Sequence, residues 1–356
     1  MSDLEDLGRR FATYLQAQMP DAEAISVNEI ARIHGGASRE TFRLVISWTQ
    51  GNKPQSRSLI LRRDPVASLI ETDRDLEYNA YKAFHPTGVP VPEPLYLETD
   101  LSHLDRPFFV MEAIENATAA SPFDPRAYGD KAETVGRQFW TILGEIHAQD
   151  PNKLGLDKTM SWVEPKDAAR TALEHWAAVI DEDELHAQPI ARAAIRWLER
   201  NLPTPAERIT MVHGDYRTGN FLFDEAGTIK AVLDWEMCHL GDPLEDVAWA
   251  ADPLWAFSDP NRPGGMIARK EALALWQNAS GLTLDPERFR WWEVFASLKG
   301  LAIWISAGKE YATGANPDPV LAYSSWYCTD VHNRVLAHRL ARIRADERSV
   351  KLGEVE

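Results

Sequence analysis

The sequence HGDYRTGN at residues 213–220, followed by LDWE at residues 233–236, contains the densest group of unusual residues in the chain. Strand-like apolar stretches flank both segments, so Asp215, Asn220 and Asp234 can converge at strand ends. Their side-chain oxygens are ligands that a hard cation such as Mg²⁺ prefers. Phosphoryl transfer needs such ligands and a carboxylate that takes the proton from the attacking hydroxyl. Loop Asp and Asn residues are commonly turn formers, so the array indicates this chemistry only if other segments agree.

The composition excludes several classes of protein. With 356 residues, of which 44% are hydrophobic, the chain can form about two domains with real cores and is not disordered. Asp and Glu (54) outnumber Lys and Arg (38), and the net charge of −16 opposes nucleic-acid binding. The two cysteines, Cys238 and Cys328, suit neither a disulfide framework nor a metal site. Because the N-terminus lacks signal-peptide features and no apolar run is long enough to span a membrane, we expect a soluble cytoplasmic protein.

Hydrophobic periodicity divides the chain into two parts near residues 115–125. In the first part we expect helices over residues 4–15 and 71–84, a turn at 100–107, and strands over 25–33, 41–48, 58–62, 95–97 and 108–114. The second part is mainly helical, with helices around residues 135–146, within 167–202 and within 270–344, and short strands at 210–212, 221–223 and 229–233. The charged run at residues 181–184 predicts a solvated turn or a helix start.

Further segments agree with a single family. These are IHGGAS, LILRRDP, a helix with Glu77 and Tyr78 leading into TGVPVPEP, PFFVMEAIE, ILGEIHAQDPNKLGL and DWEMCHLGDPLEDVAW. Together with HGDYRTGN, they resemble the aminoglycoside phosphotransferase and choline kinase superfamily, and most closely the branch whose kinase-like domain also occurs fused to acyl-CoA dehydrogenases. The resemblance implies an α+β, bilobal protein-kinase-like fold with a small antiparallel-sheet N-lobe and a larger, mainly helical C-lobe. Residues 1–115 would form the nucleotide-binding lobe with the hinge, and residues 116–356 the catalytic and acceptor-binding lobe.

The resemblance also implies roles in the second lobe. Asp215 would be the catalytic base, and Asn220 and Asp234 would bind Mg²⁺. His213 would brace the loop and carry no proton. Glu236 follows Asp234 by two residues, on the same side of an extended chain, and is a candidate ligand of a second metal.

In the first lobe, the hairpin with Gly35, Gly36 and Ser38 would lie over the nucleotide phosphates, where missing side chains let backbone N–H groups approach. Arg39 is a departure from related sequences, which commonly have Asn there. The segment containing Met111 would be the hinge between the lobes.

The strand Leu59 to Arg62 ends where most kinases have a phosphate-binding Lys. Arg62 keeps the charge but presents a fork of donors, and it would pair with Glu77. Alternation along the strand places Ile60 on the same face, against the adenine, and Arg63 on the other. In the hinge, the Glu112 carbonyl and the Ile114 N–H would read the purine edge.

Acidic and aromatic residues elsewhere favour structural roles. Asp242 and Asp246 would anchor the metal-bearing loop through backbone N–H groups. Most tryptophans belong to the core, and a minority would line an acceptor pocket; those in the C-terminal helices include Trp291, Trp292, Trp304 and Trp326.

The sequence therefore predicts a small-molecule kinase that uses ATP, or GTP, with Mg²⁺ and phosphorylates a hydroxyl group, as a monomer or homodimer. Two alternatives remain open, a nucleotide-binding pseudokinase that regulates a protein partner and a structural helical protein. Protein-kinase motifs such as His-Arg-Asp and Asp-Phe-Gly are absent from the sequence. The net charge of −16 favours a cationic acceptor such as an aminoglycoside or choline, whereas the related branch points to hydroxylated acyl or other catabolic intermediates.

Overall fold

The computed structural model describes residues 3–33, 40–64, 74–124, 126–256 and 259–353. The chain forms two compact units. The first comprises Met1–Thr118 and Lys230–Met237, and the second comprises Ala119–Ile229 and Cys238–Glu356. Two strands lie where the chain passes from one unit to the other, β6 (Ala117–Ala119) and β9 (Ile229–Val232).

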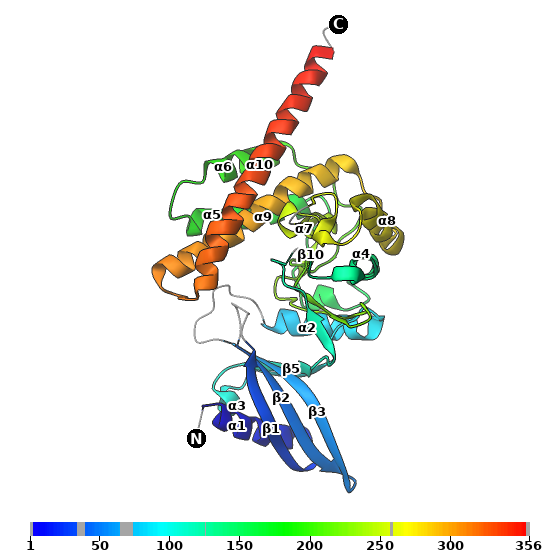
Figure 1. The fold of residues 1–356 in the computed structure, drawn as a ribbon, viewed down its shortest axis with the longest axis vertical. Helices are drawn as coiled ribbons and strands as arrows, with labels where there is room; N and C mark the ends of the chain where they lie inside the picture. Colours follow the sequence, from blue (N-terminus) through cyan, green and yellow to red (C-terminus); the bar gives the residue numbers. More distant parts are fainter. Residues whose placement is uncertain (1–2, 34–39, 65–73, 125, 257–258, 354–356) are drawn as a thin grey trace. The chain divides into compact units, whose positions relative to one another are not determined.

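The first unit is built on a five-stranded antiparallel sheet in the order β1-β2-β3-β5-β4 (Figure 1). Its strands are β1 (Glu23–Ile33), β2 (Glu40–Gln50), β3 (Lys53–Arg63), β4 (Pro94–Glu98) and β5 (Phe108–Glu112). Gln50 pairs with Lys53, and the two residues between them, Gly51 and Asn52, both have positive φ, +57° and +61°. Two positive φ values are what a type I′ hairpin turn requires, so this turn sets the register of β2 on β3.

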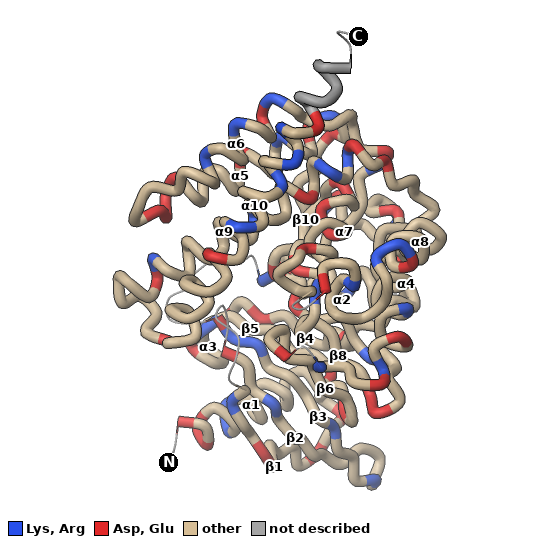
Figure 2. The backbone as a smooth tube through the Cα atoms, turned by 45° about the horizontal axis from the view of Figure 1, so that its top comes forward, with Lys and Arg blue, Asp and Glu red and all other residues tan. Residues whose placement is uncertain are grey.

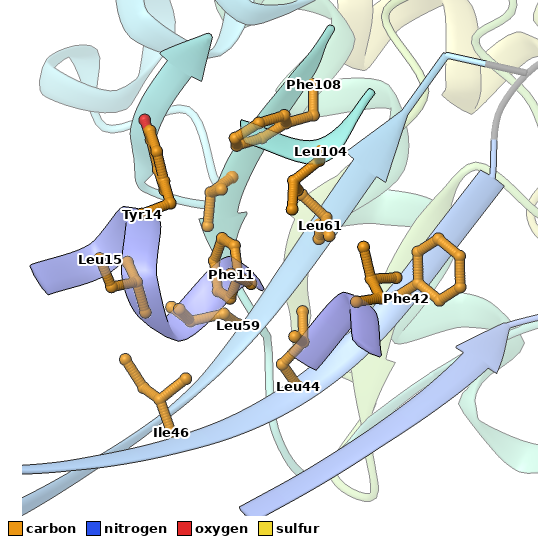
Figure 3. Close-up of a cluster of buried hydrophobic side chains, with 12 residues drawn as sticks. Phe11, Tyr14, Leu15, Phe42, Leu44, Ile46, Leu59, Leu61, Leu104 and Phe108 are labelled. Carbon is orange, nitrogen blue, oxygen red and sulfur yellow. The ribbon is translucent and has the colours of Figure 1, made fainter. Parts of the chain in front are cut away.

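Alternation along β2 and β3 decides which face of the sheet is buried by helix α1 (Asp3–Gln18). Leu59 and Leu61 belong to the core cluster shown in Figure 3, together with apolar residues of α1. The full cluster comprises Leu7, Phe11, Tyr14, Leu15, Phe42, Leu44, Ile46, Leu59, Leu61, Leu104, Phe108 and Val110. Because side chains alternate across a strand, Ile60 and Arg62 lie on the opposite face, as the sequence predicted. Helix α2 (Arg74–Phe84) supplies the partner of Arg62.

The second unit is mainly helical (Figure 1). Its helices are α4 (Ala132–Ala148), α5 (Ala168–Asp183), α6 (Pro189–Arg200), α7 (Leu244–Ala250), α8 (Arg269–Ser280), α9 (Pro286–Thr313) and α10 (Pro319–Gly353). Its short strands are β7 (Thr210–Val212), β8 (Phe221–Asp224) and β10 (His239–Gly241), and β7 pairs antiparallel with β10. Helix α9 has clear end signals: Asp285 accepts hydrogen bonds from the N–H groups of Glu287 and Arg288, and Gly314 at the other end has φ +76°.

Two sequence predictions about local structure were wrong. The expected turn at residues 100–107 contains a short helix, α3 (Leu101–Leu104), because the Asp100 side chain accepts a hydrogen bond from the Ser102 N–H. The charged run at residues 181–184 ends α5 rather than forming a turn or starting a helix. Acidic groups are unfavourable at a helix C-terminus, and here Arg192 and Lys309 offset them through ion pairs with the run.

Charged residues of both signs are interspersed along the elements of both units (Figure 2). The net charge of −16 is therefore a poor guide to the charge of a ligand. Among the described residues, no helix is both long enough and apolar enough to cross a membrane.

Candidate active site

A cluster of charged side chains surrounds Arg62 near the end of β3. Its Nη1 donates a hydrogen bond to Glu77 of α2, the partner that the sequence predicted, and lies 3.3 Å from Asp234 Oδ1. Its Nη2 lies 3.3 Å from Asp234 Oδ1 and 3.7 Å from Glu236 Oε2. The first unit thus brings together the predicted site residues Arg62, Glu77, Asp234 and Glu236.

The charges of this cluster stabilise one another. Burial by itself would lower the pKa of Arg62, but attraction to Glu77 and Asp234 outweighs burial and raises that pKa. The Glu77 side chain is fully buried, whereas 31% of the Asp234 side chain is exposed. Asp234 is therefore the carboxylate of the cluster that is most open to a ligand.

The backbone at Asp234 bends the chain. Asp234 has φ +67°, in the left-handed region that Asp tolerates better than most residues, and its N–H donates to the Tyr81 hydroxyl over 3.0 Å. Residues 236–237 form a turn. The prediction that Glu236 follows on an extended chain was therefore wrong. The left-handed residue and the turn, and not strand alternation, bring Glu236 near Arg62.

The segment predicted to read a purine begins in β5 and continues past the end of that strand. Met111 pairs with Ile60 of β3, the Glu112 N–H donates to the Glu93 carbonyl over 2.9 Å, and the Ala113 N–H donates to the Ser58 carbonyl over 3.2 Å. Within the described part of the chain, the Ile114 N–H makes no backbone hydrogen bond. The other residues predicted to contact the nucleotide, Gly35, Gly36 and Ser38, and with them Arg39, lie outside the described residues.

The carboxylate of Asp215 is the centre of a hydrogen-bond network in the second unit. Its Oδ1 accepts from Trp249 Nε1 at 2.8 Å and from Arg217 Nε at 2.9 Å. Its Oδ2 accepts from Asn220 Nδ2 at 2.6 Å and from Arg217 Nε at 3.1 Å. The predicted pair Asp215 and Asn220 is therefore in direct contact.

Asn220 keeps its amide oxygen available. Its Nδ2 donates to both the carbonyl and the carboxylate of Asp215, while within the described chain Oδ1 accepts no hydrogen bond. Gly214 and Gly219, with φ +85° and +103°, allow the loop to turn so that Asn220 folds back onto Asp215.

His213 and Asp246 hold the loop from behind. The carboxylate of Asp246 accepts from the N–H groups of His213 and Gly214 at 2.6 and 2.9 Å, which is the backbone anchoring predicted for this acid. Burial would raise the pKa of Asp246, but hydrogen bonding by His147 and the loop outweighs burial and lowers it. The Asp215 N–H donates to His213 Nδ1 at 3.1 Å, consistent with a bracing role for His213.

Asp242 has a different partner set. It accepts from the Leu244 N–H at 3.0 Å, from Trp292 Nε1 at 3.2 Å and from Arg288. It therefore joins the start of α7 to α9 and does not touch the loop that carries Asp215, so the predicted anchoring of that loop by Asp242 was wrong.

Several residues around Asp215 were missed by sequence reasoning. Lys299 in α9 is buried, donates to the Gly214 carbonyl at 2.6 Å and pairs with Glu245 at 2.8 Å. The sequence did carry a signal for a role of Lys299, because a lysine inside an otherwise apolar helical segment is unusual. Arg217 lay inside HGDYRTGN but was assigned no role, and nothing local in the sequence connects Trp249 with Asp215.

A cavity of about 370 Å³ lies beside this loop and is lined by Thr218, Trp255, Arg126 and Arg262, among others. This volume is in the usual range for small-molecule sites. The tryptophan that lines it is Trp255; Trp291 and Trp292, considered as pocket residues from sequence, are buried in the core, and 72% of Trp326 is exposed. The fourth, Trp304, donates to His332 Nδ1 at 3.1 Å.

The sequence pattern of the phosphotransferase enzyme family matches residues 29–292. The chain belongs to this family. It is 30% identical over 225 residues to acyl-CoA dehydrogenase family member 10 of Mus musculus and 28% identical over 232 residues to family member 11 of Gallus gallus. These alignments cover 62% and 64% of this chain but only 20% and 28% of the relatives, so the chain matches a small part of each.

Solved structures of phosphotransferases share the fold. A putative aminoglycoside phosphotransferase of Ralstonia eutropha JMP134 is similar with a TM-score of 0.71 and 20% identity, over 92% of this chain and 98% of that one. A choline/ethanolamine kinase family protein of Mesorhizobium loti has a TM-score of 0.58 and 15% identity, over 94% and 95%. A thermostable mutant aminoglycoside phosphotransferase, in ternary complex with ADP and hygromycin B, has a TM-score of 0.52 and 17% identity, over 91% and 97%. The predicted α+β bilobal fold and the predicted superfamily are confirmed.

Proposed function

We propose that this member of the phosphotransferase enzyme family transfers the γ-phosphoryl group of ATP, with GTP as the alternative donor, to a hydroxyl group of a small molecule. The observation that carries the proposal is the carboxylate of Asp215, which Trp249, Arg217 and Asn220 hold at the centre of the family motif. The ternary complex of the hygromycin-binding relative with ADP supports a nucleotide as donor.

In the proposed reaction Asp215 sets the acceptor hydroxyl in line with the γ-phosphorus. The hydroxyl oxygen forms a bond to that phosphorus, its proton passes to an Asp215 oxygen, and the bond from phosphorus to the bridging oxygen breaks, releasing ADP. A general base of this kind contributes on the order of 10²–10⁴ in rate. Trp249 and Asn220 limit rotation of the Asp215 carboxylate, so the protein contributes mainly the orientation of the reacting groups and the electrostatic field around them.

Each proposed ligand of Mg²⁺ is an oxygen donor of the kind that this cation prefers. Asn220 offers an amide oxygen and Asp234 a partly exposed carboxylate, and Glu236 is a candidate for a second ion. Mg²⁺ is usually bound through one or two carboxylates together with substrate phosphates, so few protein ligands are needed. When bound, Mg²⁺ would neutralise charge that develops on the transferring phosphoryl group.

Arg62, positioned by Glu77, would hold the phosphates in the first unit. The remaining nucleotide contacts that we propose are Gly35, Gly36, Ser38, Ile60, Met111, Glu112 and Ile114. We assign residues 1–115 to nucleotide binding with the hinge and residues 116–356 to catalysis and acceptor binding.

The cavity beside Thr218 is the proposed acceptor site. Ala127 lines it and is half-buried, so Ala127→Phe should fill it without removing a polar contact. This variant should raise KM for the acceptor and leave nucleotide affinity unchanged. An unchanged KM would place the acceptor elsewhere.

The test of the function is mass spectrometry of hydroxyl compounds and cell extract incubated with ATP and Mg²⁺, comparing the natural chain with Asp215→Asn. A product heavier by one phosphoryl group, made only by the natural chain, establishes the activity and identifies the acceptor. Tight ATP binding without any transfer would instead support a pseudokinase with a protein partner.

A further inference from the structure

The side chain of Arg217 lies directly on the proposed base. Its Nε is 2.9 and 3.1 Å from the two oxygens of Asp215, and its Nη1 donates to the Thr218 carbonyl at 3.0 Å. The guanidinium also lies over the Trp255 ring, 4.9 Å from its centroid. Within the described part of the chain, Nη2 makes no hydrogen bond.

These contacts occupy the acceptor positions of Asp215. A carboxylate has about four such positions, two on each oxygen. Oδ1 accepts from Trp249 and Arg217, and Oδ2 accepts from Asn220 and, at the longer distance of 3.1 Å, from Arg217. A substrate hydroxyl needs one of these positions, so one donor must leave before the base can work.

Exposure indicates which donor leaves. Trp249 is 1% exposed and Asn220 7% exposed, whereas 20% of the Arg217 side chain is exposed. Trp249 packs between Trp255 and His332, and Asn220 is held by two hydrogen bonds to Asp215. Arg217 is therefore the donor that can move at the smallest structural cost.

We infer that Arg217 caps Asp215 in the free enzyme and that the natural acceptor carries an oxyanion, a carboxylate or phosphate, close to the hydroxyl that is phosphorylated. This inference rests on the proposed function. The anionic group of the acceptor binds the Arg217 guanidinium in place of Asp215, because a guanidinium pairs well with carboxylates and phosphates through its fork of donors. Asp215 is then free to receive the hydroxyl proton as the oxygen-phosphorus bond forms and ADP leaves. A cationic acceptor cannot neutralise the Arg217 guanidinium, which would repel the positive charge of that acceptor.

The cap has a consequence that can be measured without knowing the acceptor. Water can attack the γ-phosphorus in place of a hydroxyl, giving ADP and inorganic phosphate, but it also needs a base to take its proton. While Arg217 occupies Asp215, this hydrolysis stays slow. Removing the Arg217 side chain should therefore increase the rate of ATP hydrolysis.

The experiment measures phosphate release from ATP and Mg²⁺ in the absence of acceptor. Arg217→Met should raise the rate about tenfold, a fraction of what a general base contributes. Arg217→Gln is the second neutral variant, in case the first does not fold, and the double change Asp215→Asn with Arg217→Met should return the rate to background. Arg334→Met is the matched control, because Arg334 is an exposed residue of α10 paired with Asp330, and its rate should equal that of the natural chain.

Two results would overturn the inference while leaving the proposed function intact. One is a folded, nucleotide-binding Arg217→Met or Arg217→Gln chain that hydrolyses ATP no faster than the natural chain. The other is a neutral or cationic acceptor identified by the mass spectrometric screen. If the acceptor is anionic, Arg217→Met should lower kcat/KM for it by at least about tenfold. If the natural chain neither transfers nor hydrolyses phosphate under any condition, the proposed function fails and the inference fails with it.

Discussion

Trp249 Nε1 donates a hydrogen bond to Asp215 Oδ1 over 2.8 Å, although the two residues are 34 positions apart in sequence. Trp249 lies on α7, a helix whose residues are all buried. The same helix contributes Asp246, which accepts the backbone hydrogen bonds of His213 and Gly214. Helix α7 therefore fixes both the backbone and the carboxylate of the loop, and the orientation of Asp215 is a property of tertiary packing.

Asp215→Asn should lower phosphoryl transfer by about 10² to 10⁴ while nucleotide binding is kept, because the amide cannot take the hydroxyl proton. The amide also turns an NH₂ group toward Trp249, Arg217 or Asn220, all of which donate to the carboxylate, so a modest loss of stability is expected. Initial rates and ATP binding by calorimetry check both statements.

The matched control is Asp130→Asn, at an exposed position of the same unit. It should change neither the rate nor nucleotide affinity. Full activity in Asp215→Asn would remove this residue from the chemistry.

The parts of the site that follow from local periodicity could be predicted from sequence. Alternation along β3 placed Arg62 on the face opposite Leu61, whereas the resemblance to the family, and not periodicity, implied Glu77 as its partner. The left-handed conformation of Asp234 could not be predicted, because the partner of its N–H is the Tyr81 hydroxyl of helix α2, which is distant in sequence. The contact of Trp249 with Asp215 required the folded chain for the same reason, whereas Arg217 is only two residues from Asp215 and was simply assigned no role.

Glu77→Gln should destabilise the first unit by about 3 kcal/mol, because a buried Arg62 then loses the anion nearest to it. Asp234 and Glu236 remain near the guanidinium, at 3.3 and 3.7 Å, and limit the loss. Unfolding in urea measures the change. Glu133→Gln, at a side chain that is 71% exposed, should shift stability by less than about 0.5 kcal/mol. Equal effects of the two variants would contradict a buried ion pair at Arg62.

The stability of the second unit should fall in acid partly through Asp252. Burial would raise the pKa of Asp252, but contacts with His332, Arg339 and Ser297 outweigh burial and lower the pKa from 3.8 to about 2. Because the folded pKa is lower than the unfolded pKa, the contribution is complete above about pH 4 and is lost as the pH falls toward 2. A shift of this size corresponds to roughly 2 kcal/mol.

Asp252→Asn should therefore flatten the dependence of unfolding free energy on pH between about 4 and 2, besides lowering stability at neutral pH. Denaturant unfolding at a series of pH values measures this slope. Asp330→Asn, at an exposed position of α10, should keep the slope of the natural chain. A slope unchanged by Asp252→Asn would assign the acid sensitivity to other carboxylates.

Asp234→Asn should weaken Mg²⁺ binding by at least about tenfold, the loss that follows even when a supporting group of a metal site is removed. Asn is chosen because it tolerates φ +67° nearly as well as Asp, so the backbone can be kept. In the natural chain Mg²⁺ should increase the rise in Tm produced by ATP, and the variant should lose this increase. Asp100→Asn, which keeps an equally good cap on α3, is the control. A normal response to Mg²⁺ in Asp234→Asn would place the metal on other residues.

Gly219→Ala should displace the Arg217 side chain and thereby change its contact with the proposed base Asp215. Gly219 has φ +103°, and an added Cβ would lie 3.0 Å from Arg217 Nη1 and 3.6 Å from the Ala120 carbonyl oxygen. The backbone strain alone costs about 1 to 2 kcal/mol. Gly88→Ala measures that strain separately, because Gly88 has φ +92° with no atom within 4 Å of the new Cβ. If the two variants are equally destabilised but only Gly219→Ala changes phosphate release from ATP, the effect comes from the displaced guanidinium. If both leave the rate unchanged, the position of Arg217 has no influence on Asp215.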